Sequence, residues 1–292
     1  MRTTLPRRPV RAGMNPAQSY SDDERRHFLR YTRTPQWPML QRFPIDDDGH
    51  LGLLAGMLAS RPDTVASMIR AMHDETRARA ARMLADDGYR SAVAGLRLRP
   101  DDRIVAVGDS ITADRLGWFE LLAASTGPTG AALVNLGVSG DTTADILERF
   151  DTLEAAGPGH VLLMIGTNDA RFHGRAPGYR MATIAETERN LRALIDLITH
   201  QLGASITVVT PPAVDQDRID ASFAGAPVRW TAEAVAEVAE AVRKVAPDAV
   251  DLYETTRAGA TAGFLEADGV HPTPAGHELI LRQILDRLIR TR

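Results

Sequence analysis

The chain has no cysteine, few aromatic residues and no long apolar run. Among its 292 residues there is no Cys, and Phe, Trp and Tyr together make up 5%. Without cysteine there is no disulfide framework, no thiolate nucleophile and no cysteine-based zinc site. Serine is left as the expected nucleophile. No stretch approaches the length of a membrane span, and the charged N-terminus is not followed by the apolar core of a signal peptide.

Neither sign of charge dominates the composition. The 34 basic residues against 38 acidic ones give a net charge of −4. No general electric field therefore draws the protein to nucleic acid or to an anionic membrane, and we expect a small-molecule partner and no nucleic acid. We predict a cytoplasmic protein, although a cysteine-free chain would also tolerate an oxidising compartment. Nothing in the residues determines the oligomeric state.

The character of the sequence changes near residue 100. Before it, Pro and Arg clusters surround one clear helical pattern, which starts at Pro62 and Asp63 and stops before Gly88. We predict an N-terminal, mainly helical extension over 1–99 and a catalytic domain over 100–292. The apolar, Met-containing stripe of the helix is expected to pack. A packing extension, a dimerisation element and a lid remain open for the region as a whole.

After residue 103, short apolar runs alternate with helical patterns. The runs are 104–107, 132–136, 161–165, 206–210 and 249–252. This alternation predicts an α/β fold with a five-stranded parallel sheet and crossover helices. Helical stripes end at Gly203 and near Pro247, and a last helix follows Pro272. Ligands of such sheets bind beyond the carboxyl ends of the strands, so chemistry is expected directly after each strand.

Polar motifs stand at those positions. They are Gly108-Asp109-Ser110-Ile111, the turn over 137–141, Gly166-Thr167-Asn168-Asp169 and, after a longer loop, Asp268-Gly269-Val270-His271. Each motif alone fits a turn or a helix cap. Together, at successive strand ends, they favour one catalytic site. A serine nucleophile needs a histidine to take its proton and usually a carboxylate to orient that histidine, and the set contains all three.

The four ordered motifs resemble those of the SGNH hydrolases, also called the GDSL esterase/lipase family. The resemblance runs from about residue 103 to the C-terminus and does not cover the first hundred residues. Ile111 stands where a leucine gives the family its name, a change that touches no chemistry. The resemblance implies a flavodoxin-like, three-layer α/β/α fold.

The resemblance also implies a role for each motif. Ser110 matches the nucleophile, His271 the general base and Asp268 the orienting acid. The matching oxyanion donors are the backbone N–H groups of Ser110 and Gly140 and the side-chain amide of Asn168. No metal or organic cofactor is required.

Three further residues are expected at the same edge of the sheet. Asp109 and Asp169 stay open as alternative orienters of the histidine. Together with Arg171, they are also candidates for supporting or substrate-binding roles. The loops over 171–179 and 211–230 follow the third and fourth strands, so we expect them to border the mouth of the pocket.

We predict a serine esterase that acts on a short-chain acyl or O-acetyl ester through an acyl-serine intermediate. A thioesterase or a lysophospholipase would use the same residues. Two hypotheses come from other classes: a metal-dependent phosphoesterase, because the motifs offer oxygen and nitrogen ligands, and a non-catalytic carbohydrate-binding homologue. The natural substrate and its acyl chain length are left open.

Overall fold

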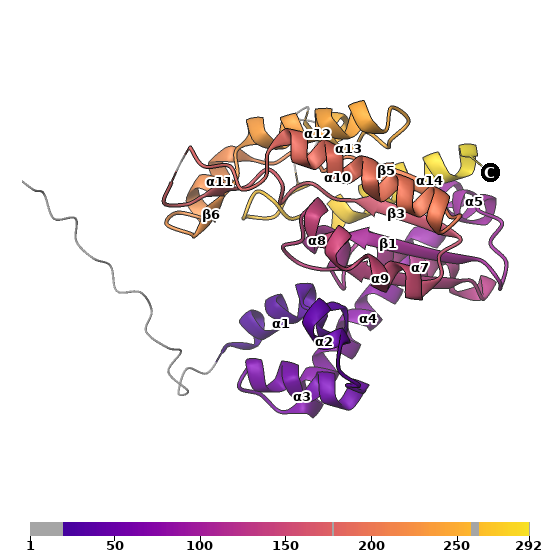
Figure 1. Cartoon of the computed structure of the whole chain (residues 1–292). Coiled ribbons are helices and arrows are strands. Elements are labelled where there is room, and N and C mark those ends of the chain that lie inside the picture. Colours follow the sequence, from indigo (N-terminus) through magenta and orange to yellow (C-terminus); the bar gives the residue numbers. More distant parts are fainter. Residues whose placement is uncertain (1–19, 177, 258–262, 292) are drawn as a thin grey trace, which may run out of the picture.

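A parallel sheet forms the centre of the computed structural model, which describes residues 20–176, 178–257 and 263–291 (Figure 1). Its strands pair in the order β2-β1-β3-β5. They are β1 (Arg103–Gly108), β2 (Ala132–Gly137), β3 (His160–Met164) and β5 (Ser205–Val209), while β4 (Phe172–His173) and β6 (Val228–Arg229) form a separate antiparallel pair. Because β1, β2 and β3 are adjacent and parallel, the motifs that follow them meet at one edge.

The prediction of a fifth strand over 249–252 is wrong for the described part of the chain. Val250 forms only an isolated parallel bridge to Val209. Its N–H donates to the carbonyl of Val208 at 2.9 Å, and its own carbonyl accepts from Thr210 at 3.0 Å. Helix α13 (Leu252–Arg257) begins two residues later, so the chain leaves the sheet before a ladder can extend. The other four predicted strands are confirmed.

Helices cover both faces of the sheet, which confirms the three-layer α/β/α arrangement (Figure 1). Successive strand residues point to opposite faces, so Ile104 and Ala106 belong to one core cluster and Val105 and Val107 to the other. The first face is covered by α4 (Pro62–Leu84), α5 (Asp87–Gly95), α7 (Trp118–Thr126) and α14 (Pro274–Thr291). The second is covered by α8 (Thr143–Glu148), α9 (Phe150–Ala156), α10 (Ile184–Asp196) and α12 (Ala232–Val245).

The described N-terminal region is helical, as predicted. Besides α4 and α5 it contains α1 (Asp22–Tyr31), a 3₁₀ turn (Thr34–Gln36), α2 (Pro38–Gln41) and α3 (Asp47–Met57). The far end of α4 joins the core against the sheet through Met83. Its beginning packs with α1 and α3 in a second apolar cluster, which also takes in Leu116. The predicted start of the extension, residues 1–19, lies outside the described residues.

Short helices make the remaining connections. They are α6 (Ser110–Ala113), a 3₁₀ turn (Gly127–Thr129), a π-helical turn that extends α10 (Leu197–Gln201) and α11 (Gln216–Ser222). Trp118 and Phe119 are buried in the core. Among the described residues, no helix is both long enough and apolar enough to cross a membrane.

Candidate active site

Ser110 lies where β1 gives way to α6. Asp109 is the N-cap of this helix, and its Oδ1 accepts a hydrogen bond from the backbone N–H of Ile111 at 3.0 Å. The capping interpretation of the Gly-Asp-Ser motif therefore holds for Asp109. Ser110 is the first helical residue, at the carboxyl edge of the sheet.

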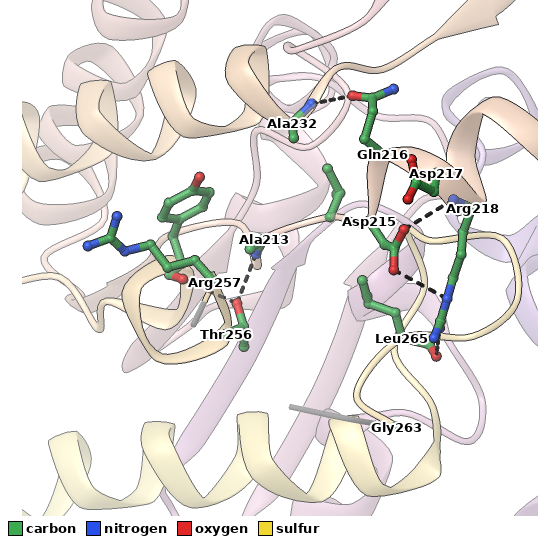
Figure 2. Close-up of a pocket in the computed structure, with 12 residues that line it drawn as sticks. Ala213, Asp215, Gln216, Asp217, Arg218, Ala232, Thr256, Arg257, Gly263 and Leu265 are labelled. Atoms are coloured by element: carbon green, nitrogen blue, oxygen red, sulfur yellow. Dashed lines mark hydrogen bonds and ion pairs between the residues drawn. The ribbon is translucent and has the colours of Figure 1, made fainter. Parts of the chain in front are cut away.

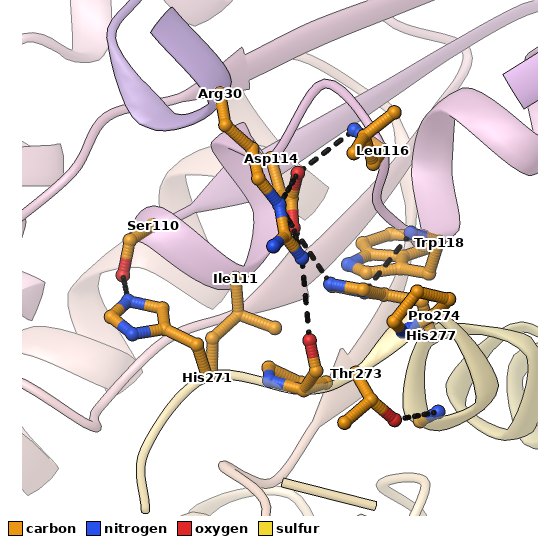
Figure 3. A network of polar contacts seen from close by, with 12 residues as sticks. Arg30, Ser110, Ile111, Asp114, Leu116, Trp118, His271, Thr273, Pro274 and His277 are labelled. Carbon is orange, nitrogen blue, oxygen red and sulfur yellow. Dashed lines mark hydrogen bonds and ion pairs between the residues drawn. The ribbon is translucent and has the colours of Figure 1, made fainter. Parts of the chain in front are cut away.

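Ser110, His271 and Asp268 form a continuous chain of polar contacts. Ser110 Oγ lies 2.9 Å from His271 Nε2 (Figure 3), and His271 Nδ1 lies 2.6 Å from Asp268 Oδ2. The imidazole and carboxylate side chains are 18% and 23% exposed. The Ser110 hydroxyl and the Asp268 carboxylate thus contact different nitrogens of the His271 ring, and this ring is partly exposed to solvent.

The turn over 268–271 is held by its own backbone. Asp268 Oδ1 accepts from the N–H groups of Val270 and His271, both at 2.9 Å. Gly269, which lies between Asp268 and Val270, has φ +75°. A Cβ at this position would come within 2.6 Å of the carbonyl oxygen of Asp215. Burial acts to raise the pKa of Asp268, but the hydrogen bond and charge of His271 and the two backbone donors outweigh it and lower the pKa to about 2. The carboxylate is therefore ionised at neutral pH.

Asp109 and Asp169, the two other carboxylates that could orient His271, form hydrogen bonds with other groups. Asp169 accepts from the N–H and the hydroxyl of Thr143, at 3.0 and 2.6 Å, and so caps the start of α8. Asp109 is buried, and burial raises its pKa to about 6. Within the described ranges, no hydrogen bond joins either carboxylate to His271. The geometry supports Asp268 as the residue that orients the ring.

Two of the three candidate oxyanion donors, Gly140 and Asn168, lie on segments that Arg171 joins. Its guanidinium donates to the carbonyl of Gly140 at 2.9 Å and to that of Asn168 at 3.0 Å. Gly140 has φ +92°, a conformation that favours glycine. Asn168 Nδ2 donates to the carbonyl of Asp141 at 3.0 Å, which fixes the amide and leaves its second N–H. In the described part of the chain, the backbone N–H groups of Ser110 and Gly140 donate no hydrogen bond.

A second polar network lies next to the serine (Figure 3). Asp114, the residue after α6, is fully buried and binds the Arg30 guanidinium from α1 at 2.7 Å. Asp114 also accepts from His277 Nε2 at 2.9 Å, and Arg30 reaches Glu266 at 2.6 Å. Sequence reasoning missed all four residues. They belong to no local motif, and Arg30 and Glu266 are 236 positions apart.

One of the two loops expected at the pocket mouth, that over 211–230, borders a cavity. The cavity has a volume of about 500 Å³ and lies beside Asp215, Gln216 and Arg218, with Arg257 of α13 across from them (Figure 2). Tyr253 of α13 and Gly263 also line it. Residues 258–262, which precede Gly263 in the sequence, are not among those described. Arg180, which directly follows the other predicted loop, pairs with Glu237. Residue 177 of that loop also lies outside the described residues.

No group of three or more His, Asp or Glu side chains in the described residues is arranged to hold a metal ion. His271, the only histidine of the four motifs, faces Ser110 and Asp268. The ligand set that a metal-dependent phosphoesterase would need is therefore not assembled in this part of the chain.

A parallel α/β sheet with a serine, an imidazole and a carboxylate aligned at its carboxyl edge defines a serine hydrolase. A family model described as the GDSL-like Lipase/Acylhydrolase family matches residues 106–279, which is more than half of the chain. The chain belongs to this family, and the protein is an ester hydrolase.

Two characterised proteins resemble the chain in sequence. An acetylxylan esterase from Geobacillus stearothermophilus is 29% identical over 201 residues, which cover 65% of this chain and 86% of that protein. The esterase TesA from Pseudomonas aeruginosa is 29% identical over 192 residues, covering 62% of this chain and 85% of TesA. Both alignments leave about a third of the present chain unmatched.

Solved structures share the fold. A variant of an acetyl-xylooligosaccharide esterase from Geobacillus superposes with a TM-score of 0.50 at 24% identity, covering 64% of this chain and 94% of that one. An α/β hydrolase from the metagenome of Lake Arreo gives a TM-score of 0.50 at 23% identity, with coverage of 66% and 97%. These likenesses support the three-layer assignment.

Proposed function

We propose that the protein is a serine esterase that releases a short-chain acyl group, and in particular an O-acetyl group, from a small molecule. The observation that carries this proposal is the chain of contacts from Ser110 Oγ through His271 to Asp268, at 2.9 and 2.6 Å. The likeness to an acetylxylan esterase supports the acetyl group. The low aromatic content, 5%, argues against an interfacial lipase for long-chain fats.

In the first half-reaction, Ser110 Oγ attacks the ester carbonyl carbon while His271 Nε2 takes the hydroxyl proton. Asp268, ionised at neutral pH, stabilises the imidazolium through the Nδ1 proton and keeps the ring in the required tautomer. The imidazolium then gives its proton to the leaving alkoxide. The products of this step are a free alcohol and an acyl group on Ser110.

Negative charge develops on the carbonyl oxygen in the transition state. The backbone N–H groups of Ser110 and Gly140 and the second amide hydrogen of Asn168 are the proposed donors to it. Arg171 supports two of them, because its guanidinium bridges the segments that carry Gly140 and Asn168. Water, deprotonated by His271, then attacks the acyl-enzyme, and the acid leaves as Ser110 takes back a proton.

A panel of p-nitrophenyl esters of increasing chain length, together with acetylated xylo-oligosaccharides, tests the substrate class. We expect kcat/KM to be highest for acetyl and to fall with chain length. A preference for long acyl chains or for thioesters would contradict the O-acetyl assignment and favour the lysophospholipase or thioesterase hypothesis.

Two further measurements test the nucleophile. A fluorophosphonate should label Ser110 covalently, and Ser110→Ala should abolish both labelling and turnover. Activity unchanged in this variant would remove Ser110 from the mechanism. Turnover that disappears on exhaustive chelation would favour a metal-dependent enzyme, and binding of sugars without labelling would favour a non-catalytic homologue.

Two statements about the whole chain remain predictions. The division into 1–99 and 100–292 is supported by the positions of the proposed catalytic residues, all of which follow residue 100. A cytoplasmic location would be checked by cell fractionation.

A further inference from the structure

The last turn of α1, in the N-terminal region, contacts three of the segments that carry the proposed catalytic residues. The carbonyl of Arg30 accepts from the N–H of Arg115, shortly after α6, at 2.9 Å. The carbonyl of Tyr31 accepts from Ser139 Oγ, next to Gly140, at 2.7 Å. Both side chains also reach the segment of His271. Residues 30 and 31 therefore lie against the serine, oxyanion and histidine segments at the same time.

Arg30 links the serine segment to the histidine segment. Its Nε is 2.8 Å from both carboxylate oxygens of Asp114, while its Nη1 donates to Glu266 at 2.6 Å. Its Nη2 lies 3.4 Å from the carbonyl of Pro272, the residue after His271. A guanidinium offers several donors in one rigid plane, so a single side chain can fix both segments. Asp114 and Glu266 are four residues after Ser110 and two before Asp268.

Tyr31 packs against the proposed general base. Its ring centroid lies 4.7 Å from that of His271, with the planes tilted by 42°. The Tyr31 side chain is buried, with the residue 8% exposed, and its hydroxyl has no hydrogen-bond partner among the described residues. Its contact with the imidazole is therefore made by the ring. An aromatic ring there restricts the tilt of an imidazole whose two nitrogens are held by Ser110 and Asp268.

We propose that Tyr31 and Arg30 are positioning residues of the active site, with Tyr31 holding the plane of the His271 ring and Arg30 holding the serine and histidine segments in register. The inference rests on the proposed function, in which His271 acts on Ser110. It assigns part of the N-terminal region to the catalytic centre. Neither residue exchanges a proton with the substrate, so their effect falls on the rate of the chemical step rather than on substrate binding.

The test compares Tyr31→Ala with Tyr31→Phe and with a control tyrosine. Tyr89 is also buried, at 1% exposed, but its hydroxyl binds Ser125 on α7. Tyr31→Ala should lower kcat by about 30- to 100-fold with KM changed less than about threefold, because misplacement of a catalytic group by about 1 Å costs on the order of 100-fold. Tyr31→Phe, which keeps the ring, should restore kcat.

Tyr89→Ala should lower Tm, as Tyr31→Ala does, while kcat per folded molecule stays at the wild-type value. Should Tyr31→Ala fold poorly, Tyr31→Leu keeps apolar volume without the aromatic plane and should still lose kcat. Wild-type kcat in Tyr31→Ala or in Tyr31→Leu would overturn the role of Tyr31. So would a loss of kcat in Tyr31→Phe as large as in Tyr31→Ala, since the hydroxyl rather than the ring would then matter.

Arg30 is tested by Arg30→Lys and Arg30→Met, followed by the rate at which a fluorophosphonate labels Ser110. We expect slower labelling in both variants, because lysine keeps the charge without the planar fork. Labelling at the wild-type rate in both would overturn the role of Arg30. Ser110→Ala in the same series separates the two proposals: if it retains turnover, the proposed function fails, and if it is inactive while the Tyr31 and Arg30 variants are unimpaired, only the positioning roles fail.

Discussion

Two regions of the molecule each pair a histidine with an aspartate, and they do so in opposite ways. In the turn over 268–271, the histidine and aspartate side chains are 18% and 23% exposed. At the junction of α6 and α14, His277 and Asp114 are both 0% exposed. The contact distances are similar, at 2.6 and 2.9 Å. An Asp–His contact by itself therefore does not identify a catalytic pair.

The second nitrogen of each ring makes the difference. His277 Nδ1 accepts from the backbone N–H of Trp118 at 3.2 Å, so both of its nitrogens are engaged in the core. His271 presents its second nitrogen to Ser110, a hydroxyl whose proton it can take. Burial disfavours the charged imidazole and lowers the pKa of His277, despite the opposite influence of Asp114. We infer that one pair stabilises the fold and the other is arranged for proton transfer.

Replacement of His271 is the strongest test of the different roles of the two Asp–His pairs. His271→Ala should lower kcat by about 10⁴- to 10⁶-fold, because loss of the base removes the function of the whole triad. Tm should change little, since the side chain is partly exposed. His200 is the matched control: it pairs with Asp196 at 3.0 Å on an exposed helix surface, and His200→Ala should leave kcat and Tm unchanged. A His271→Ala variant with more than a tenth of wild-type kcat contradicts the assignment.

Asp268→Asn should have the next largest effect, a loss of about 10⁴-fold in kcat. The amide offers a donor where His271 Nδ1–H needs an acceptor, so the ring is driven to the wrong tautomer. Steady-state kinetics at neutral pH measure the loss. Asp114→Asn, in the buried pair, should lower Tm and, because it weakens the contact with Arg30, lower kcat by far less than Asp268→Asn does. An equal loss of kcat in Asp268→Asn and Asp114→Asn would contradict the different roles assigned to the two Asp–His pairs.

His277→Ala should act mainly on stability. It leaves the N–H of Trp118 without a partner in the core and removes one donor to Asp114 Oδ2, which Arg30 still contacts. A buried group left unpaired costs about 1–3 kcal/mol. We expect the free energy of unfolding to fall by about 3 kcal/mol in urea titrations, with kcat per folded molecule changed less than about tenfold because Arg30 still pairs with Asp114. Unaltered stability with a large loss of kcat would reverse the roles that we assign.

The smallest expected effect concerns acid stability. The pKa of Asp268 is lowered from 3.8 to about 2, so its ionised form stabilises the folded state by about 2 kcal/mol. A lowered pKa gives stability that is complete above pH 3.8 and is lost as the pH falls through about 2. Urea titrations from pH 5 to 2 should show a shallower pH dependence in Asp268→Asn. Asp63→Asn, at a side chain that is 93% exposed, should behave like wild type.

Most of the sheet was predictable because its strands are continuous apolar runs bounded by turn residues. Four of the predicted strands match the observed ones to within one residue at each end. The run over 249–252 is also mostly apolar, although Asp251 interrupts it, but α13 begins at Leu252 and leaves one bridge at Val250. Apolar composition reports that a segment is buried; it does not report how many residues remain before the chain turns away.

The sequence predicted the site residues that belong to local motifs, but it did not predict those that come from distant parts of the chain. Ser110, Asn168, Asp268 and His271 stand directly after strands or in a four-residue motif, and the structure brings all of them to one edge. Arg30 and Tyr31 carry no such signal. An arginine in the last turn of an amphipathic helix usually lies in solvent, and its contact with Glu266 depends on folding across 236 positions.

Gly269 sets a condition on any redesign of substrate preference. The N–H of Asp215 donates to its carbonyl at 2.9 Å, and the Asp215 carbonyl leaves no room for a side chain at residue 269. The loop that borders the 500 Å³ cavity therefore packs directly against the turn that carries His271. A directed-evolution library would do better to spare 213–215 and also Arg218, which donates to the carbonyls of Leu265 and Glu266 at 2.8 and 3.1 Å. Shifting either would displace the turn that carries His271 and lower turnover.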